Sequence, residues 1–259
     1  MGNKGRYLLL INPWVYDFAA YDLWTKPLGL LYLAALLIKN RWTITYIDCL
    51  DVYHPALKIL GIKEPGRRPD HRGHFYREEV AKPLPLQSIP RRFYRFGLPP
   101  EVFRKALLAL PAPHAILITS GMTYWYQGVH DVIKIVKEAF PRVPVILGGI
   151  YASLCAEHAE ANSGADFICK GEGESQILEL LEGLTGISPS CPPHPNDFGS
   201  LPSPAPADHR LLCAASSSPR LLKTSAFRRF RGVPRRTTFT FRATGTLFGG
   251  RQAWSLQAW

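Results

Sequence analysis

Five short apolar runs alternate with segments of helical periodicity over residues 1–186. The runs occupy residues 7–11, 43–47, 115–119, 144–147 and 166–169, and each is followed by a polar residue or glycine. Between them, residues 28–40 are apolar nearly all round, whereas 129–140 and 174–182 place apolar side chains at helical spacing. Continuous apolar strands separated by helices predict a parallel sheet covered on both faces. Right-handed crossovers limit this α/β fold to a doubly wound, five-stranded sheet.

The carboxyl ends of the predicted strands are where we expect a ligand, because open α/β sheets bind ligands just beyond those ends. The residues there are polar or small: Asn12, Asp48, Ser120, Gly121, Gly148, Gly149, Gly171 and Glu172. Thr123 follows the third strand closely enough to join them. These nine positions are our candidate cofactor-binding residues. The sequence offers no candidate catalytic residue.

One long insertion, residues 52–113, separates the second and third predicted strands. Its middle part, residues 61–100, contains seven prolines, nine lysines or arginines and four acidic residues. A loop of this length with little regular structure is usually a lid, a docking surface or disordered. We expect one helix within it, over residues 101–110.

The C-terminal part of the chain has a different composition. Residues 189–206 include seven prolines, which predicts a linker over 187–206. Residues 209–259 contain ten lysines or arginines and no acidic residue, so most of the net charge of +11 lies there. We expect residues 207–259 to be disordered or translated out of frame. The alternative is a genuine basic tail that binds nucleic acid or another anion.

The overall composition agrees with a folded protein that does not cross a membrane. Hydrophobic residues make up 46% of the 259 residues, which is enough to bury a substantial core. The longest apolar run, residues 28–38, is shorter than the roughly 18 residues of a membrane span. The five cysteines are scattered along the chain, as is usual in a reducing compartment. We therefore expect a cytoplasmic location and no membrane partner.

Each candidate motif also has a purely structural interpretation. Gly148 and Gly149 either let a ligand approach the backbone or form an ordinary tight turn. Ser120 and Thr123 either hold a polar ligand tail or phosphate, or cap the following helix. The stretch 171–174 lacks the third glycine of a dinucleotide fingerprint and follows the last strand, which excludes nicotinamide binding.

Aromatic residues gather after the first and third predicted strands. They are Trp14, Tyr16, Phe18, Tyr21, Trp24, Tyr124, Trp125 and Tyr126. These side chains form either an apolar wall over a large, flat cofactor or the packing between loops and insertion. His71 and His74 are spaced like a pair of metal ligands, but no third ligand is evident, so we assign no metal site.

Six segments, taken in their order and spacing, resemble the cobalamin (vitamin B12)-binding N-terminal domain of radical S-adenosylmethionine enzymes. They are residues 12–13 (NP), 26–34 (KPLGLLYLA), 46–48 (YID), 119–123 (TSGMT), 145–149 (VILGG) and 171–174 (GEGE). The resemblance covers about residues 5–186 and implies a Rossmann-like domain that holds cobalamin at the carboxyl edge of its sheet. It further implies that the groove for the corrin or its nucleotide tail is lined by Ser120, Thr123, Gly148, Gly149, Gly171 and Glu172.

Two departures from the patterns of cobalamin proteins limit what the resemblance implies. In many of these proteins a D-x-H-x-x-G motif places a histidine below the cobalt, but residues 48–55 do not have that spacing. We therefore expect no protein imidazole on the cobalt. The C-x-x-x-C-x-x-C motif, whose thiolates hold the cluster that binds S-adenosylmethionine, is also absent. S-adenosylmethionine and a four-iron, four-sulfur cluster are thus expected only in full-length relatives, and the radical barrel is missing from this chain.

Three hypotheses about function follow. The first is a cobalamin-binding module of a radical S-adenosylmethionine enzyme, often a methyltransferase, that has no catalytic activity on its own and no nucleic-acid partner. The second is a non-catalytic interaction protein that binds an acidic partner or nucleic acid through its basic insertion and tail, with the sheet as scaffold. A stand-alone transferase ranks last, because no nucleophile or acid–base pair is evident.

Overall fold

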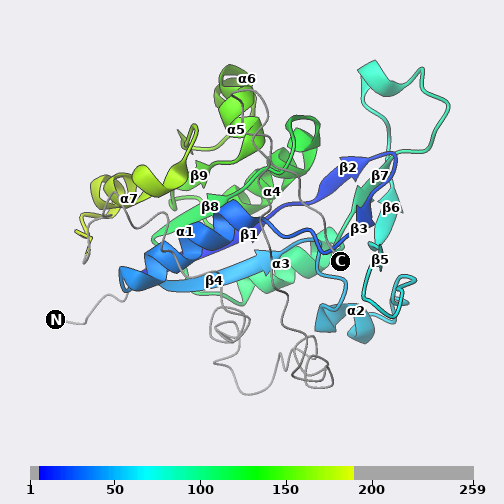
Figure 1. Ribbon diagram of the computed structural model, residues 1–259, viewed down its shortest axis with the longest axis horizontal. Helices are drawn as coiled ribbons and strands as arrows, with labels where there is room; N and C mark the ends of the chain where they lie inside the picture. Colours follow the sequence, from blue (N-terminus) through cyan, green and yellow to red (C-terminus); the bar gives the residue numbers. More distant parts are fainter. Residues whose placement is uncertain (1–5, 190–259) are drawn as a thin grey trace, which may run out of the picture. The chain divides into compact units, whose positions relative to one another are not determined.

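The computed structural model describes residues 6–189, and its centre is a five-stranded parallel sheet in the order β10-β9-β8-β1-β4 (Figure 1). The strands are β1 (Tyr7–Asn12), β4 (Thr43–Asp48), β8 (Ala115–Ile118), β9 (Val145–Leu147) and β10 (Phe167–Ile168). The chain runs from β1 to its neighbour β4, then crosses to β8 on the other side of β1 and continues outward to β10. The predicted doubly wound α/β fold is therefore confirmed.

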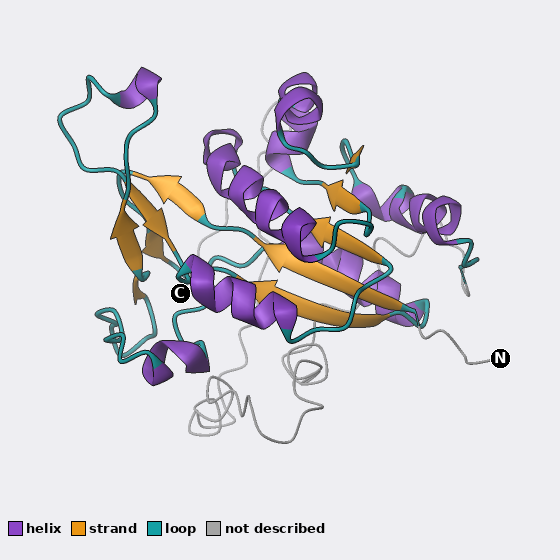
Figure 2. Ribbon diagram, turned by 180° about the vertical axis from the view of Figure 1, so that it is seen from behind, coloured by secondary structure: helices purple, strands orange, loops and turns teal. Residues whose placement is uncertain are grey.

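Helices cover both faces of this sheet (Figures 1 and 2). One face packs on α1 (Leu28–Lys39) and α7 (Ile177–Thr185). The other packs on α3 (Pro100–Leu108), α4 (Tyr126–Ala139), α5 (Ile150–Leu154) and α6 (Ala156–Asn162). Leu8 and Leu10 of β1 point to the first face, and Leu9 and Ile11 point to the second. All four are completely buried, which explains why this strand is an unbroken apolar run.

Helix α1 is less buried than its sequence predicts. Its composition is apolar nearly all round, but only Leu30, Ala34, Leu36 and Leu37 are buried. Leu28, at its first turn, is 57% exposed and Ile38 is 40% exposed. An all-round apolar composition is typical of a buried helix, but α1 lies on the outside of the sheet and has only one face to bury.

The insertion is folded, contrary to the expectation of a long irregular loop. It contains α2 (Pro55–Ile59), β5 (Gly73–His74), β6 (Arg77–Glu79), η1 (Leu84–Leu86), β7 (Tyr94–Phe96) and α3. Strand β7 lies between β6 and β2 (Val15–Asp17) in an antiparallel sheet, and β5 pairs with β3 (Tyr21–Asp22). Helix α3 confirms the helix expected at residues 101–110. Two further 3-10 turns, η2 (Thr123–Trp125) and η3 (Gly173–Ser175), precede α4 and α7.

Trp14 fixes the insertion to the main sheet. Its side chain is 1% exposed, and its indole N–H donates to the carbonyl of Leu98 at 2.7 Å. The ring packs edge-on against Phe103 of α3 with the ring centroids 5.2 Å apart. Gly128 of α4 is so close to the Trp14 carbonyl that an added Cβ would lie 2.0 Å from its oxygen. Three segments distant in sequence therefore meet at Trp14.

Two sequence expectations lie largely or wholly outside the described residues. These are the proline-rich linker at 187–206, of which 187–189 are described, and the basic tail at 207–259. Within residues 6–189, no helix combines the length and the apolar character needed to cross a bilayer.

The close contact at Gly128 predicts a large stability effect. Gly128→Ala should lower the free energy of unfolding by about 1–3 kcal/mol, because the added methyl group overlaps the Trp14 carbonyl and forces α4 away from it. In Gly183→Ala, a helical glycine of α7 with nothing within 4 Å of the added Cβ, stability should rise by up to about 1 kcal/mol. Urea denaturation of both variants measures the difference, and equal stabilities would contradict this packing.

Candidate functional site at the carboxyl edge of the sheet

Ser120 joins the ends of β8 and β9. It is 2% exposed, and its hydroxyl donates to the carbonyl of Gly148 at 2.8 Å. The same oxygen accepts from the backbone N–H of Tyr151 at 3.1 Å, while the Ser120 carbonyl accepts from the N–H of Ile150 at 2.9 Å. The hydroxyl is thus occupied by the protein itself. The Ser120 oxygen thus ties the end of β8 to the turn after β9, and a direct contact between Ser120 and a ligand stays a prediction.

The glycine pair after β9 forms a tight turn against Ser120. Gly149 has a left-handed φ of 92°, and a Cβ there would lie 2.5 Å from the Ser120 carbonyl oxygen. The positive φ and the close approach of Ser120 therefore explain why this residue is a glycine. Gly148 is different, because an added Cβ would meet nothing closer than 3.9 Å. Gly148 is half-buried and Gly149 is exposed, so their backbone is accessible from outside the sheet.

The remaining candidates after β8 and β10 lie on the surface of the same edge. Gly121 is exposed, and Thr123 begins η2 in a half-buried position. Gly171 is exposed with a φ of 75°, and its N–H donates to the Ser153 hydroxyl at 3.0 Å, which ties β10 to α5. Glu172 is exposed beside it. The ends of β8, β9 and β10 thus form a continuous edge, because these strands are neighbours in the sheet.

Asn12 and Asp48 are joined to each other on the other side of the edge. The Asn12 amide donates to the Asp48 carboxylate at 2.8 Å, across the neighbouring ends of β1 and β4. The second carboxylate oxygen lies 2.8 Å from the ammonium of Lys26. Burial acts to lower the pKa of Lys26, but the carboxylates of Asp48, Asp51 and Asp22 together outweigh it and the pKa is raised. Lys26 is therefore a member of this edge that the nine candidate residues do not include.

Other groups near this edge offer little chemistry of their own. Burial raises the pKa of the Cys49 thiol after β4 and of the Cys169 thiol after β10, so neither is a ready nucleophile. The hydroxyl of Tyr46 is buried without a hydrogen-bond partner among residues 6–189, and burial raises its pKa as well. This arrangement is suited to binding, and no acid–base pair is assembled on it.

Exposed apolar side chains surround the edge and form a rim around it. The sequence predicts only some of the residues of this rim. Of the expected aromatic wall, Trp14 and Tyr16 are buried in the core, whereas Trp24 and Tyr124 are 59% and 54% exposed. Trp24 has a φ of 62°, its indole donates to the Asp70 carbonyl, and Arg72 stacks on its ring. Three further exposed residues lie on helices that begin at the edge: Leu28, Ile150 and Leu154.

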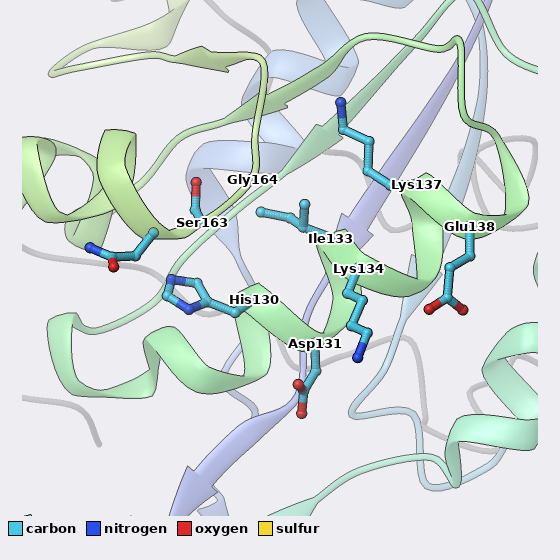
Figure 3. A pocket seen from close by; sticks show the side chains of 9 residues that line it. His130, Asp131, Ile133, Lys134, Lys137, Glu138, Ser163 and Gly164 are labelled. Atoms are coloured by element: carbon cyan, nitrogen blue, oxygen red, sulfur yellow. The ribbon is translucent and has the colours of Figure 1, made fainter.

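The hollow drawn in Figure 3 lies away from this edge. It measures about 560 Å³ and is lined by side chains from α4 and from the end of α6. Three of the lining side chains, Lys134, Lys137 and Glu138, belong to the C-terminal half of α4. This half lies toward the amino ends of the strands, opposite the carboxyl edge. The part of the chain that the structure describes brings together no group of three metal-ligating side chains, and His71 and His74 contact Tyr53 and Tyr21.

Comparison with known proteins identifies the class of domain at this edge. Residues 93–181 match the family model of the B12 binding domain. The matched segment runs from β7 into α7 and contains β8, β9 and β10, together with seven of the nine candidate residues. Over these residues the chain is therefore similar to the B12 binding domain.

A second comparison finds similarity over a longer part of the chain. The chain is 25% identical over 182 residues to the cytidylyl-2-hydroxyethylphosphonate methyltransferase of Streptomyces wedmorensis. The alignment covers 69% of this chain and 28% of that protein. The chain thus spans little more than a quarter of the length of the relative that it matches.

The role of Ser120 predicts a specific loss of stability. Ser120→Ala should lower the free energy of unfolding by about 1–3 kcal/mol, because two buried backbone groups lose their partner. Ser153→Ala removes one hydrogen bond from a half-buried serine at the same edge and should cost less than about 1 kcal/mol. Urea denaturation compares the two variants. A Ser120→Ala protein as stable as the wild type would contradict the assignment.

Proposed function

We propose that this protein binds cobalamin at the carboxyl edge of its parallel sheet. The observation that carries the proposal is the match of residues 93–181 to the B12 binding domain, since this segment supplies the glycine turns of β9 and β10. The proposed domain comprises residues 5–186, because β1 and β4 complete the sheet on which those turns stand. The candidate residues would act through accessible backbone at Gly121, Gly148 and Gly171, with Thr123 and Glu172 beside them.

The edge fits a large flat ligand in shape and polarity. The glycines leave the backbone open, and an added Cβ at Gly171 would meet nothing within 4 Å. Exposed apolar residues on α1, η2 and α5 border this backbone, which suits a ligand with apolar faces. Ser120, Asn12 and Asp48 would support the edge from beneath, since their polar atoms are already hydrogen-bonded within the protein.

We propose that no histidine of residues 6–189 would ligate the cobalt of a bound cobalamin. The histidine closest in sequence to the end of β4, His54, accepts a hydrogen bond from the N–H of Ala56 and caps α2. A bound cobalamin supplies a cobalt centre that accepts and donates a methyl group. In keeping with the resemblance and with the methyltransferase relative, we propose that the domain serves a radical S-adenosylmethionine enzyme that transfers methyl groups.

The alternative function, binding of an acidic partner through the insertion, gains no support from the fold. Most arginines of the insertion form ion pairs or ring contacts with other residues of the protein. Four of them form ion pairs with acidic residues: Arg67 with Asp22, Arg72 with Asp70, Arg92 with Glu79 and Arg95 with Glu78. Two more, Arg77 and Arg91, stack on the rings of Tyr94 and Phe18. Most of the positive charge of this segment therefore has a partner within the protein.

The direct test is to mix the purified protein with hydroxocobalamin, remove free ligand by gel filtration and record the visible spectrum. We expect the protein peak to carry the corrin absorption. The match of the B12 binding domain ends at residue 181, so removal of residues 207–259 should leave the absorption unchanged. A colourless protein peak would overturn the proposal, and nucleic-acid binding that disappears with residues 207–259 would favour the alternative.

Gly148→Val tests the position of the site. The side chain has room within the fold, because an added Cβ at Gly148 meets its nearest atoms at 3.9 Å. It would cover the accessible backbone between β8 and β10, so the affinity for hydroxocobalamin should fall at least about tenfold, or 1.4 kcal/mol. Gly66→Val, at an exposed glycine of the insertion with nothing within 4 Å, is the matched control and should bind like the wild type. Equal affinity of both variants in a spectroscopic titration would place the site elsewhere.

A further inference from the structure

Two histidines and a tyrosine form a hydrogen-bonded cluster behind the glycine turn. The hydroxyl of Tyr151 on α5 lies 2.7 Å from Nδ1 of His158 on α6 and 3.1 Å from Nε2 of His130 on α4. The two imidazole rings are stacked, with centroids 6.1 Å apart and planes 15° from parallel. Tyr126 contacts all three rings. His130 is also visible in Figure 3, on the side of α4 that faces Ser163.

A single hydroxyl hydrogen limits how this cluster can be protonated. The Tyr151 hydroxyl donates to one imidazole nitrogen only, so the other imidazole must donate its N–H to the hydroxyl oxygen. The imidazole that accepts is then neutral. If it takes up a proton, both rings present N–H groups to the same oxygen, and the hydroxyl hydrogen loses its acceptor. Acid therefore leaves the buried hydroxyl hydrogen without an acceptor and places a cation beside the stacked second ring.

On balance, the charged groups around the cluster do not stabilise its protonated form. Asp131 on α4 acts to raise the pKa of His130, but its carboxylate already accepts a hydrogen bond from Tyr16 of β2. Lys134 lies along the same hollow as His130 and adds positive charge. Burial and Cys155, between α5 and α6, both act to raise the pKa of Tyr151, which reaches about 12. The tyrosine thus keeps its proton throughout the physiological range.

Tyr151 connects this cluster directly to the candidate site. Its side chain lies in the cluster, and its backbone N–H donates to the Ser120 hydroxyl, which in turn donates to the Gly148 carbonyl. Only Gly149 and Ile150 separate Gly148 from Tyr151 along the chain. A displacement of the Tyr151 side chain therefore reaches the glycine turn through the first turn of α5.

We propose that Tyr151 is a positioning residue and that the His130–Tyr151–His158 cluster makes the glycine turn sensitive to pH. At neutral pH the cluster holds α5 against α4 and α6, and below about pH 6.5 its protonation loosens α5. The loosening is a property of the protein alone. Its effect on cobalamin affinity rests on the proposed function.

The direction of the pH dependence follows from the neutral state of the cluster. Burial and the neighbouring His158 lower the pKa of His130 below its ordinary 6.5. A lowered histidine pKa means that the unfolded chain binds the proton more readily than the folded one. The stabilising contribution is therefore complete above pH 6.5 and is lost as the pH falls through the lower, folded-state pKa of His130.

Hydrogen exchange without cobalamin tests the loosening. After correction for intrinsic exchange rates, amides of residues 150–162 in the wild type should exchange about tenfold faster at pH 5.5 than at pH 7.5. The increase follows because the loosened state binds the proton more readily than the closed state, and a tenfold change in this equilibrium corresponds to about 1.4 kcal/mol. In the double variant His130→Gln, His158→Gln, which carries amides that do not titrate, the change should be less than twofold. His114→Gln, at the opposite end of β8, should behave like the wild type.

Titration with hydroxocobalamin at the same two pH values tests the coupling to the site. Affinity of the wild type and of His114→Gln should fall about tenfold at pH 5.5, while that of the double variant should change less than twofold. The ligand's own titration cancels, because all proteins are compared at each pH. Exchange that does not depend on pH overturns the inference even when cobalamin binds. Absence of binding at pH 7.5 overturns the proposed function and leaves the exchange result to decide the loosening.

Discussion

The buried hydroxyl of Ser120 is the interaction on which the carboxyl edge of this sheet depends. Neighbouring parallel strands are not joined by a short turn, so the ends of β8 and β9 need a contact between residues far apart in sequence. Ser120 provides it, because one oxygen both donates to Gly148 and accepts from Tyr151. The left-handed Gly149 follows from the same contact, since any side chain there would overlap the backbone of Ser120. The turn is therefore shaped by the protein and leaves its outer side open.

The insertion folds because it uses part of the main domain as its own. Its three-stranded sheet includes β2, which follows β1 after only two residues, so the small sheet cannot separate from the large one. Trp14 lies in this short connection and is covered by Leu98, Phe103 and Gly128. Arg95 of β7 stacks on the same indole, so one of the insertion's positive charges helps to attach it. A segment rich in proline and arginine is thus ordered by long-range contacts.

The contrast between the two sheets shows what the sequence could predict. The strands of the parallel sheet are buried on both faces, so their apolar runs are unmistakable and their carboxyl ends mark the candidate site in advance. Strands such as Arg77–Glu79 carry no such run, because pairing with β7 determines them and their side chains remain exposed. The sequence also could not distinguish a serine that contacts a ligand from one that ties two strands. That distinction depends on whether the Ser120 side chain turns inward, which only the packing against Gly148 decides.

The carboxyl edge is open on one side, and this affects how a cofactor would be held. A small molecule in a protein site usually buries most of its surface, whereas the glycine turns of β8, β9 and β10 and the apolar rim around them form a surface on one side only. A disc-shaped ligand lying there would be contacted mainly through one face and its edge. Its other face would remain accessible to a second protein surface, as a cofactor shared between two protein surfaces requires.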